Sequence, residues 1–168
     1  MRSPKLLDKA QAQQKLRDLT QNEDLEINLL IITSLNLFNL YLLEWKVSED
    51  KTTLDEIYQL LDQLQELVNI QRLLPLGVEL QLFRALLALV QGDLSQGDTQ
   101  ITEAINIAQT HQLPRLVAKA QELHTQIQSQ VKEWQALLDE NASIAQRLEK
   151  TEMEDYLKAA MRIKYSLG

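Results

Sequence analysis

The sequence of 168 residues contains no cysteine, only four glycines and three prolines, and 5% aromatic residues. The absence of cysteine excludes disulfides, thiolate metal ligands and a cysteine nucleophile. Few residues favour turns or strands, because glycine and proline are so scarce. Leucine, glutamine, alanine and glutamate abound instead, and these side chains lose little rotamer freedom in a helix. The composition therefore predicts an all-α fold.

The chain also lacks a basic region. Its formal net charge is −7, and residues 51–112 alone hold 3 basic and 8 acidic side chains. A protein that follows a phosphate backbone needs a basic face, so we expect no nucleic-acid partner. The acidic middle of the chain favours basic ligands, which it would steer by long-range attraction.

One uncharged run, Ile27 to Leu43, resembles a membrane span. Several polar residues interrupt it, and it is flanked by Glu26 and Glu44. It is shorter than the roughly 20 residues that a helix needs to cross a hydrocarbon core of about 30 Å, and its flanks lack the basic bias of an oriented span. We interpret it as a buried helix and expect no membrane partner. The segment from Met1 to Thr20 is charged and lacks the apolar core of a signal peptide, which favours a cytoplasmic protein.

Helix breakers divide the chain into what we expect to be a single domain over residues 1–168. Pro75 and Pro114 are each placed to open a helix, because proline is favoured in a first helical turn. The expected parts are an N-terminal capping helix (1–21), two helix-pair repeats (22–112), and a long helix to about residue 149 followed by a C-terminal capping helix (113–168). The sequence leaves open whether the long helix stays whole or folds back near Asn141.

Two matches along the chain indicate an internal repeat. Leu74-Pro75 recurs as Leu113-Pro114, and the apolar pattern of 54–68 recurs over 94–108. A fixed period of this size, about 40 residues, is typical of stacked helix pairs. The sequence therefore predicts a helix pair that occurs at least twice.

Small residues mark the second of these pairs. Gly92 and Asp93 lie between two apolar-periodic segments, where the chain turns back on itself. Ala85 precedes this turn, whereas Gly97 and Ala104 follow it. Two antiparallel helices need small side chains where their backbones approach, and this spacing supplies them on both sides of the turn.

Residues 82–114 resemble one unit of the tetratricopeptide repeat, in its long variety of about 40 residues. Ala85 matches the small position of the first helix of that unit, Gly92-Asp93 its turn, and Gly97 and Ala104 the small positions of its second helix. Gln81 and Ala88 stand at the usual aromatic positions. The preceding pair has a longer turn without a matching glycine, and its register stays open. The resemblance implies a short right-handed superhelix.

In that family the first helix of each pair lines a concave groove. The resemblance places Glu79, Leu82, Leu86 and Leu89 there. An exposed leucine stripe is unusual, so either a partner helix occupies the groove or the second or sixth helical segment of this chain fills it. Asn36 and Asn39 are further groove candidates, because asparagine holds peptide backbones in many such domains. Both could equally be buried and hydrogen bonded within the fold.

The inventory of reactive side chains argues against catalysis. The only histidines are His111 and His124, and Glu122 precedes His124 at the wrong step for a Glu-x-x-His metal motif. Gly92 and Gly97 have no lysine after them, unlike the glycines of a phosphate-binding loop. We therefore expect no enzyme, no metal and no cofactor.

The function expected from the sequence is that of a non-enzymatic scaffold or adaptor that binds a protein or peptide partner, with a homodimer as one form of such binding. The main alternative is a sensory or regulatory module of a larger signalling or transcription regulator, which would bind a small ligand or peptide. A self-associating array segment is a third possibility. An enclosed pocket would favour the sensor, an open leucine groove the adaptor, and exposed apolar end helices self-association.

Overall fold

A computed structural model describes residues 4–21 and 26–162, and these fold entirely into helices and short connections. The expected all-α class is confirmed. The helices are α1 (Pro4–Thr20), α2 (Ile27–Ser48), α3 (Lys51–Gln71), α4 (Leu74–Gln91), α5 (Leu94–Thr110), α6 (Pro114–Ser129), α7 (Val131–Asp139), α8 (Ile144–Thr151) and α9 (Met153–Met161).

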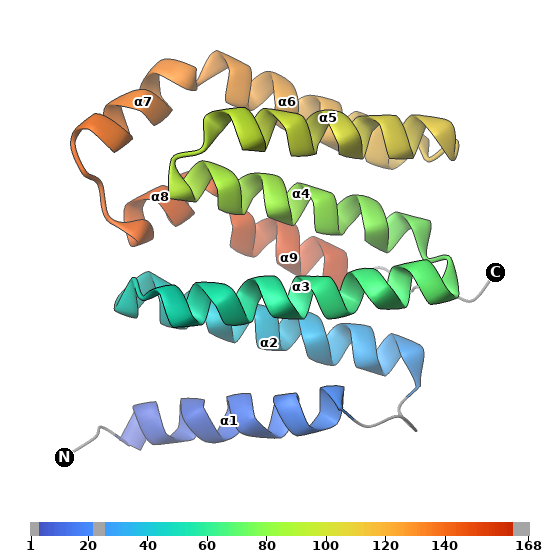
Figure 1. Cartoon of the computed structure of the whole chain (residues 1–168), viewed down its shortest axis with the longest axis vertical. Coiled ribbons are helices and arrows are strands. Elements are labelled where there is room, and N and C mark those ends of the chain that lie inside the picture. The colour runs from blue at the N-terminus through green and yellow to red at the C-terminus, as the bar shows by residue number, and fades with distance from the viewer. Residues whose placement is uncertain (1–3, 22–25, 163–168) are drawn as a thin grey trace.

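The helices stack as neighbouring antiparallel pairs (Figure 1). α1 lies at one end against α2, α3 follows α2, and α5 packs between α4 and α6. α7 leads away from this stack, and the chain then turns back so that α8 and α9 pack against both α2 and α4. α4 therefore lies at the centre, in contact with α3, α5, α6, α8 and α9.

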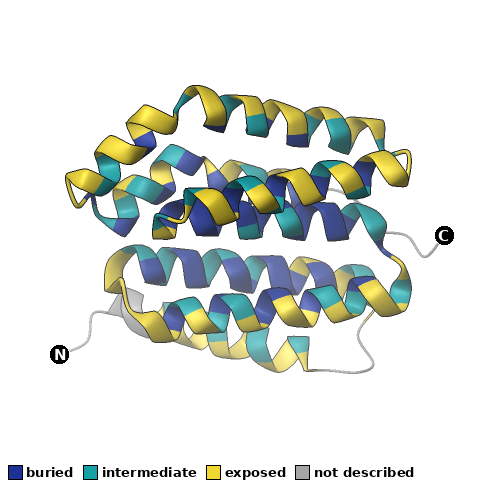
Figure 2. Cartoon of the chain, turned by 45° about the horizontal axis from the view of Figure 1, so that its top comes forward, coloured by how far each residue is buried: buried dark blue, intermediate teal, exposed yellow. Residues whose placement is uncertain are grey.

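α2 and α4 form most of the core (Figure 2). Both are long and apolar enough to cross a membrane by length and composition alone, but 72% of the apolar window of α4 and 44% of that of α2 are buried inside the protein. Phe38 of α2 and Phe83 of α4 meet edge to face, with ring centroids 5.2 Å apart. Burial against neighbouring helices accounts for the apolar character of α4.

The turn between α2 and α3 is the same length as the turn between α4 and α5. Glu49 and Gly92 both adopt left-handed backbone angles, with φ of 52° and 90°. The next residues, Asp50 and Asp93, accept hydrogen bonds from the backbone amides of Thr53 and Gln96. The expectation of a longer first turn is therefore wrong, because a glutamate takes the left-handed position that a glycine usually fills.

The repeat interval is the same for the helix starts and for the hydrogen bonds of the first turn in α4 and α6. α4 begins at Leu74 and α6 at Pro114. In the first turn of each helix the amides of Gly77 and Val117 donate to the carbonyl oxygens of Leu73 and Leu113, which stand at the same interval as the helix starts. The interval between the two prolines is one residue shorter, because Pro114 is the first residue of its helix and Pro75 the second.

The segment from Pro114 to about residue 149 is not one long helix, and the break near Asn141 that the sequence left open is present. The chain breaks at Gln130 and again over 140–143, where Asn141 has φ of 53°. These breaks turn α7 toward the α4–α5 turn, and an ideal Cβ at Gly92 would lie 2.9 Å from Cδ2 of Leu138. They also free α8 and α9 to fold back.

Gly97 lies where α4 and α5 approach closely. An ideal Cβ at this position would lie 2.9 Å from Cδ2 of Leu89 and 3.3 Å from the carbonyl oxygen of Ala85. Ala85 and Ala104 are themselves fully buried. Close approach of the two backbones therefore accounts for the small residues on both sides of the Gly92-Asp93 turn.

We expect Gly97→Val to lower the free energy of unfolding by about 1–3 kcal/mol, because the added atoms force α4 and α5 apart. Urea unfolding followed by circular dichroism would measure the change. Thr99→Val is the matched control, because Thr99 is exposed on the same helix. Equal effects of the two substitutions would contradict close packing at Gly97.

Candidate functional site

The candidate site is the groove, defined as the surface of α2, α4 and α6 on the side where α8 and α9 lie. α8 and α9 pack against both α2 and α4 there. Met153, Leu157 and Ala160 form one seam of α9 and are 1%, 0% and 0% exposed. Their spacing of four and three positions places them on one helical face. The groove is therefore filled by the chain itself.

Hydrogen bonds from two residues of α8 help to fix the fold-back. A carboxylate oxygen of Glu49, in the α2–α3 turn, accepts a 3.0 Å hydrogen bond from the amide of Ile144 at the start of α8. Arg147 donates to the carbonyl oxygen of Val90, near the end of α4. A carboxylate at a helix start and a guanidinium at a helix end both complement the helix dipole. α8 is thus attached to both helix pairs of the stack.

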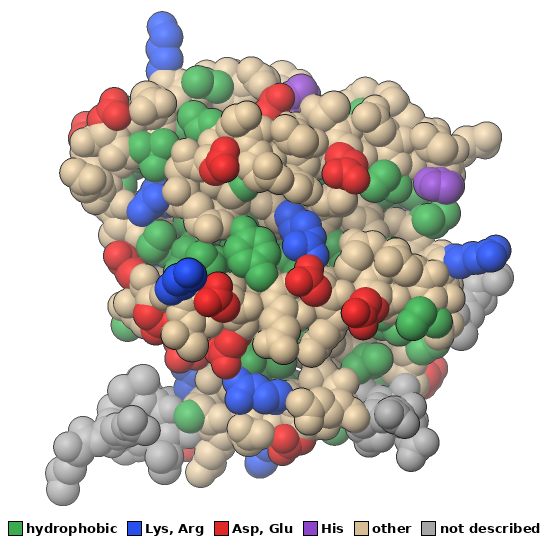
Figure 3. Space-filling model, viewed as in Figure 1, with side chains coloured by type: hydrophobic (Ala, Val, Ile, Leu, Met, Phe, Trp, Pro, Cys, Tyr) green, Lys and Arg blue, Asp and Glu red, His purple; other side chains and the backbone are tan. Residues whose placement is uncertain are grey.

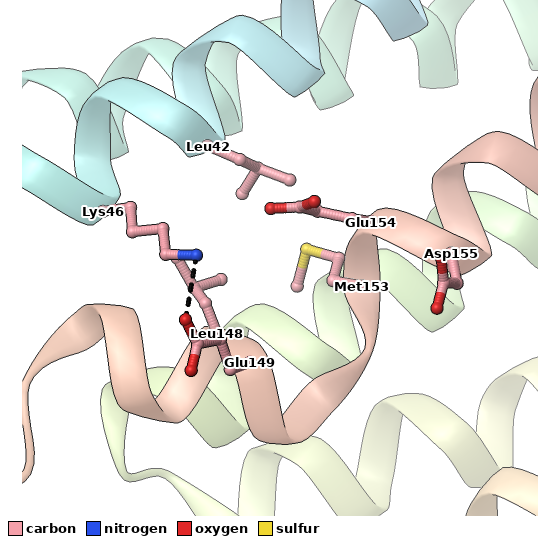
Figure 4. Close-up of a pocket in the computed structure, with 7 residues that line it drawn as sticks. All are labelled: Leu42, Lys46, Leu148, Glu149, Met153, Glu154 and Asp155. Atoms are coloured by element: carbon pink, nitrogen blue, oxygen red, sulfur yellow. Dashed lines mark ion pairs between the residues drawn. The ribbon is translucent and has the colours of Figure 1, made fainter.

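A cavity of about 180 Å³ lies where α2 packs against α8 and α9 (Figure 4). Lys46 crosses it to form a 3.2 Å ion pair with Glu149. The carboxylate of Glu154 points into the same space, beside the sulfur of Met153. Over residues 4–21 and 26–162, no group of three or more histidine, cysteine, aspartate or glutamate side chains is placed to hold a metal ion. Charged side chains therefore line this cavity between α2 and α8–α9.

A buried charge pair lies in the groove. Lys119 of α6 contacts both carboxylate oxygens of Glu79 at 2.8 and 2.7 Å, and Glu79 is only 1% exposed. The ammonium of Lys119 also lies 5.2 Å from the ring centroid of Tyr156 in α9, a cation–π contact. The three residues join α4, α6 and α9. α9 therefore closes over a charge pair as well as over apolar side chains.

Burial changes the proton affinities of this cluster. Desolvation raises the pKa of Glu79, and the positive charge and hydrogen bonds of Lys119 oppose that rise. Desolvation also raises the pKa of Tyr156, and the charges of Glu122, Glu152 and Glu79 add to the effect. Both shifts favour the neutral form of a group removed from water. Lys119 therefore stabilises the ionised form of the buried Glu79 side chain.

The leucines expected to line the groove are part of the core. Leu82 and Leu86 are each 1% exposed and Leu89 is fully buried. Leu89 faces α5, where it meets Gly97. Of the two alternatives that the sequence left open, the described residues therefore match a groove filled by the chain itself. α8 and α9 pack against α4, and Lys119 of α6 contacts Glu79, so helices other than the second and sixth helical segments also lie against α4 here.

Asn36 and Asn39 are half-buried on α2. The amide of Asn36 donates a 2.8 Å hydrogen bond to the carbonyl oxygen of Ile32 in its own helix. Leu29 and Ile32 are 50% and 38% exposed. This part of α2 therefore presents apolar and amide groups together.

Lys119 and Tyr156 were not predicted as site residues from the sequence. One signal was present: Glu79 is the only acidic residue in the apolar segment 74–91, and Lys119 stands at the equivalent position one repeat later. Opposite charges at equivalent positions of neighbouring repeats meet across adjacent helices. Tyr156 carried no comparable signal, because its contact depends on the fold-back of α9.

The described residues define an all-α protein of packed helix pairs whose C-terminal helices cover two of the preceding helices. No protein-family model, curated protein or solved structure matches the chain.

Two residues with a left-handed backbone conformation offer a test of how α8 is attached. Arg72 and Glu49 have φ of 54° and 52°, a conformation that favours glycine. We expect Arg72→Gly to raise stability by up to about 1 kcal/mol, because its side chain is exposed and its backbone strain is relieved. Glu49→Gly should instead lower stability, because it also removes the acceptor of the Ile144 amide. Thermal unfolding of both variants measures the difference, and a stabilised Glu49→Gly variant would contradict this attachment.

Proposed function

We propose that this chain is a non-enzymatic, tetratricopeptide-like module that binds a partner helix in the groove now occupied by α8 and α9. The observation that carries the proposal is that α9 lies in the groove with one apolar face buried. It indicates that the groove accepts an amphipathic helix. The shared turn geometry at Glu49-Asp50 and Gly92-Asp93, and the regular repeat of helix starts, support the tetratricopeptide-like assignment.

The seam of α9 defines the partner. A competing helix would carry small or apolar residues at the positions of Met153, Leu157 and Ala160, and an aromatic ring at that of Tyr156, which lies over Lys119. Such helix-in-groove recognition depends on anchors spaced by three or four positions. The seam therefore predicts a sequence pattern for the partner.

A partner helix must compete with α9, which is part of the same chain, and this competition sets the partner's affinity for the groove. A covalently linked α9 acts at an effective concentration in the millimolar range. A free helix with the same contacts would bind the intact groove weakly, because it must first displace this segment. Partner binding is therefore expected to be strong only when α9 is released or the partner makes better contacts.

A peptide of residues 143–162 tests this proposal. Leu157→Ser in the full chain removes the central seam residue and weakens α9, and the fluorescently labelled peptide should then bind at least about tenfold more tightly to this variant than to the unmodified chain. Fluorescence anisotropy measures the affinity. Circular dichroism establishes that the variant remains folded.

The matched control is the same peptide carrying Leu157→Asp, which keeps the length and places a charge at the seam. It should not bind either chain. Equal binding of both peptides, or no binding to a folded Leu157→Ser chain, would contradict a groove that accepts helices.

Self-association is a second candidate, favoured by the exposed apolar side chains of α2. Leu29 and Ile32 lie close together and are 50% and 38% exposed. Light-scattering chromatography would show a dimer that Ile32→Glu converts to a folded monomer. A monomer in both cases would exclude α2 as a dimer interface.

A further inference from the structure

A second hollow lies on the opposite face of the molecule from the groove, between α3, α4 and α5. Its volume is about 610 Å³. Val68, Gly77 and Ile107 contribute apolar surface, and Gln81, Gln100 and Glu103 contribute polar groups. Figure 3 shows this face, on which acidic side chains follow α3 and α5 on both sides of the space between them.

Two residues that line this hollow have side-chain oxygens without hydrogen-bond donors. The side-chain oxygens of Gln81 and Gln100 are buried, and within the part of the chain that the structure describes neither has a hydrogen-bond partner. Glu103 is exposed and forms no ion pair or hydrogen bond with any described residue. Buried acceptors in folded proteins are nearly always paired, so two in one hollow point to a ligand that supplies donors.

The other polar groups of the hollow are already paired or lie at its edge. Arg84 donates a 2.7 Å hydrogen bond to Asp62, so an acidic neighbour balances its charge. The amide of Gln65 donates to Asn69 within α3, and His111 contributes to the lining from the end of α5. The acceptors that remain are thus two amide oxygens and one carboxylate.

We propose that this hollow binds the arginine side chain of a partner protein. A guanidinium carries five N–H donors and no acceptor, so it can pair with the exposed carboxylate of Glu103. It can also pair with Gln81 and Gln100 when their side chains turn the buried amide oxygens toward the hollow. Its planar shape suits a carboxylate, and its weak hydration suits a partly buried site. The aliphatic stem would pack on Val68 and Ile107. The excess of acidic over basic side chains in residues 51–112, 8 against 3, attracts such a ligand.

The proposal is tested on the full chain with N-acetyl-arginine amide as the probe. Titration followed by ¹⁵N–¹H NMR should move the side-chain amide signals of Gln81 and Gln100 in a saturable way. N-acetyl-citrulline amide, which has the same length and no charge, should bind more weakly by about tenfold, the change expected when a charge-assisted contact is lost.

Two variants complete the test. Glu103→Gln should weaken binding of the arginine probe by about tenfold, whereas Glu140→Gln, an equal change of charge at an exposed residue after α7, should leave it unchanged. Saturable shifts with N-acetyl-glutamate amide and none with the arginine probe would overturn the proposal, as would no shift with either. The groove takes no part in this experiment, so its result is independent of the proposed helix binding.

Discussion

Lys119→Met is expected to destabilise the protein by about 3–5 kcal/mol at pH 7, because it leaves the carboxylate of Glu79 buried without its cation. Glu79 is 1% exposed, whereas the side chain of Lys119 is 23% exposed. Partial exposure of the lysine places the expected loss at the lower end of that range. Urea unfolding of the full chain measures it.

The loss of stability in Lys119→Met should depend on pH, because the pKa of Glu79 differs between the folded and unfolded states. Burial raises this pKa above its ordinary value of 4.5 in the folded protein, and removal of Lys119 raises it further. Between 4.5 and the raised pKa, the folded state holds more protons than the unfolded state, so stability increases as the pH falls. The deficit of Lys119→Met should therefore shrink as the pH is lowered from 7 toward the ordinary pKa of a glutamate.

The double variant Glu79→Leu with Lys119→Met is the control. It replaces the pair by apolar side chains and is expected to be close to the unmodified protein in stability, or above it. A double variant that loses as much as Lys119→Met alone would show that methionine at this position disrupts packing, and that the buried charge is not the cause.

Leu86→Glu is expected to abolish folding. Leu86 is 1% exposed at the centre of α4, so the substitution removes about 2–5 kcal/mol of packing and transfer energy and also buries a carboxylate without a partner. Together these terms approach the whole stability of a domain of this size. Circular dichroism and chromatography would show an unfolded or aggregated chain.

Leu29→Glu is the matched control for that experiment. Leu29 is 50% exposed on α2, and the same substitution there should leave the fold intact with a change within about 0.5 kcal/mol. A folded Leu86→Glu chain would mean that α8 and α9 do not cover the leucines in solution. The open groove that the sequence left possible would then be correct.

The sequence predicted what depends on local pattern. The helical class, the Gly92-Asp93 turn and the close approach at Gly97 all follow from residues near in the chain. The α2–α3 turn was misjudged because Glu49 carries no sign of a left-handed conformation, which its carboxylate and its amide support through contacts with α8 and α2.

The covering of the groove could not be predicted from the same pattern. The leucine stripe of α4 specifies that something apolar must lie against it, and it leaves the identity of that element open. α9 reaches it because the chain breaks at Gln130 and again over 140–143, and neither proline nor glycine marks either break. Beyond that break Trp134 is buried and Leu138 lies against Gly92, and such contacts depend on the whole fold.

The order in which a ribosome makes this chain gives the fold-back a further consequence. Leu157 is made long after Leu86, and at about 5–20 residues per second the leucines of α4 emerge roughly 4–14 seconds before the helix that will cover them. During synthesis the half-made protein therefore carries an uncovered apolar trough. Any helix that fits it, including one from a neighbouring nascent chain, could enter before α9 arrives.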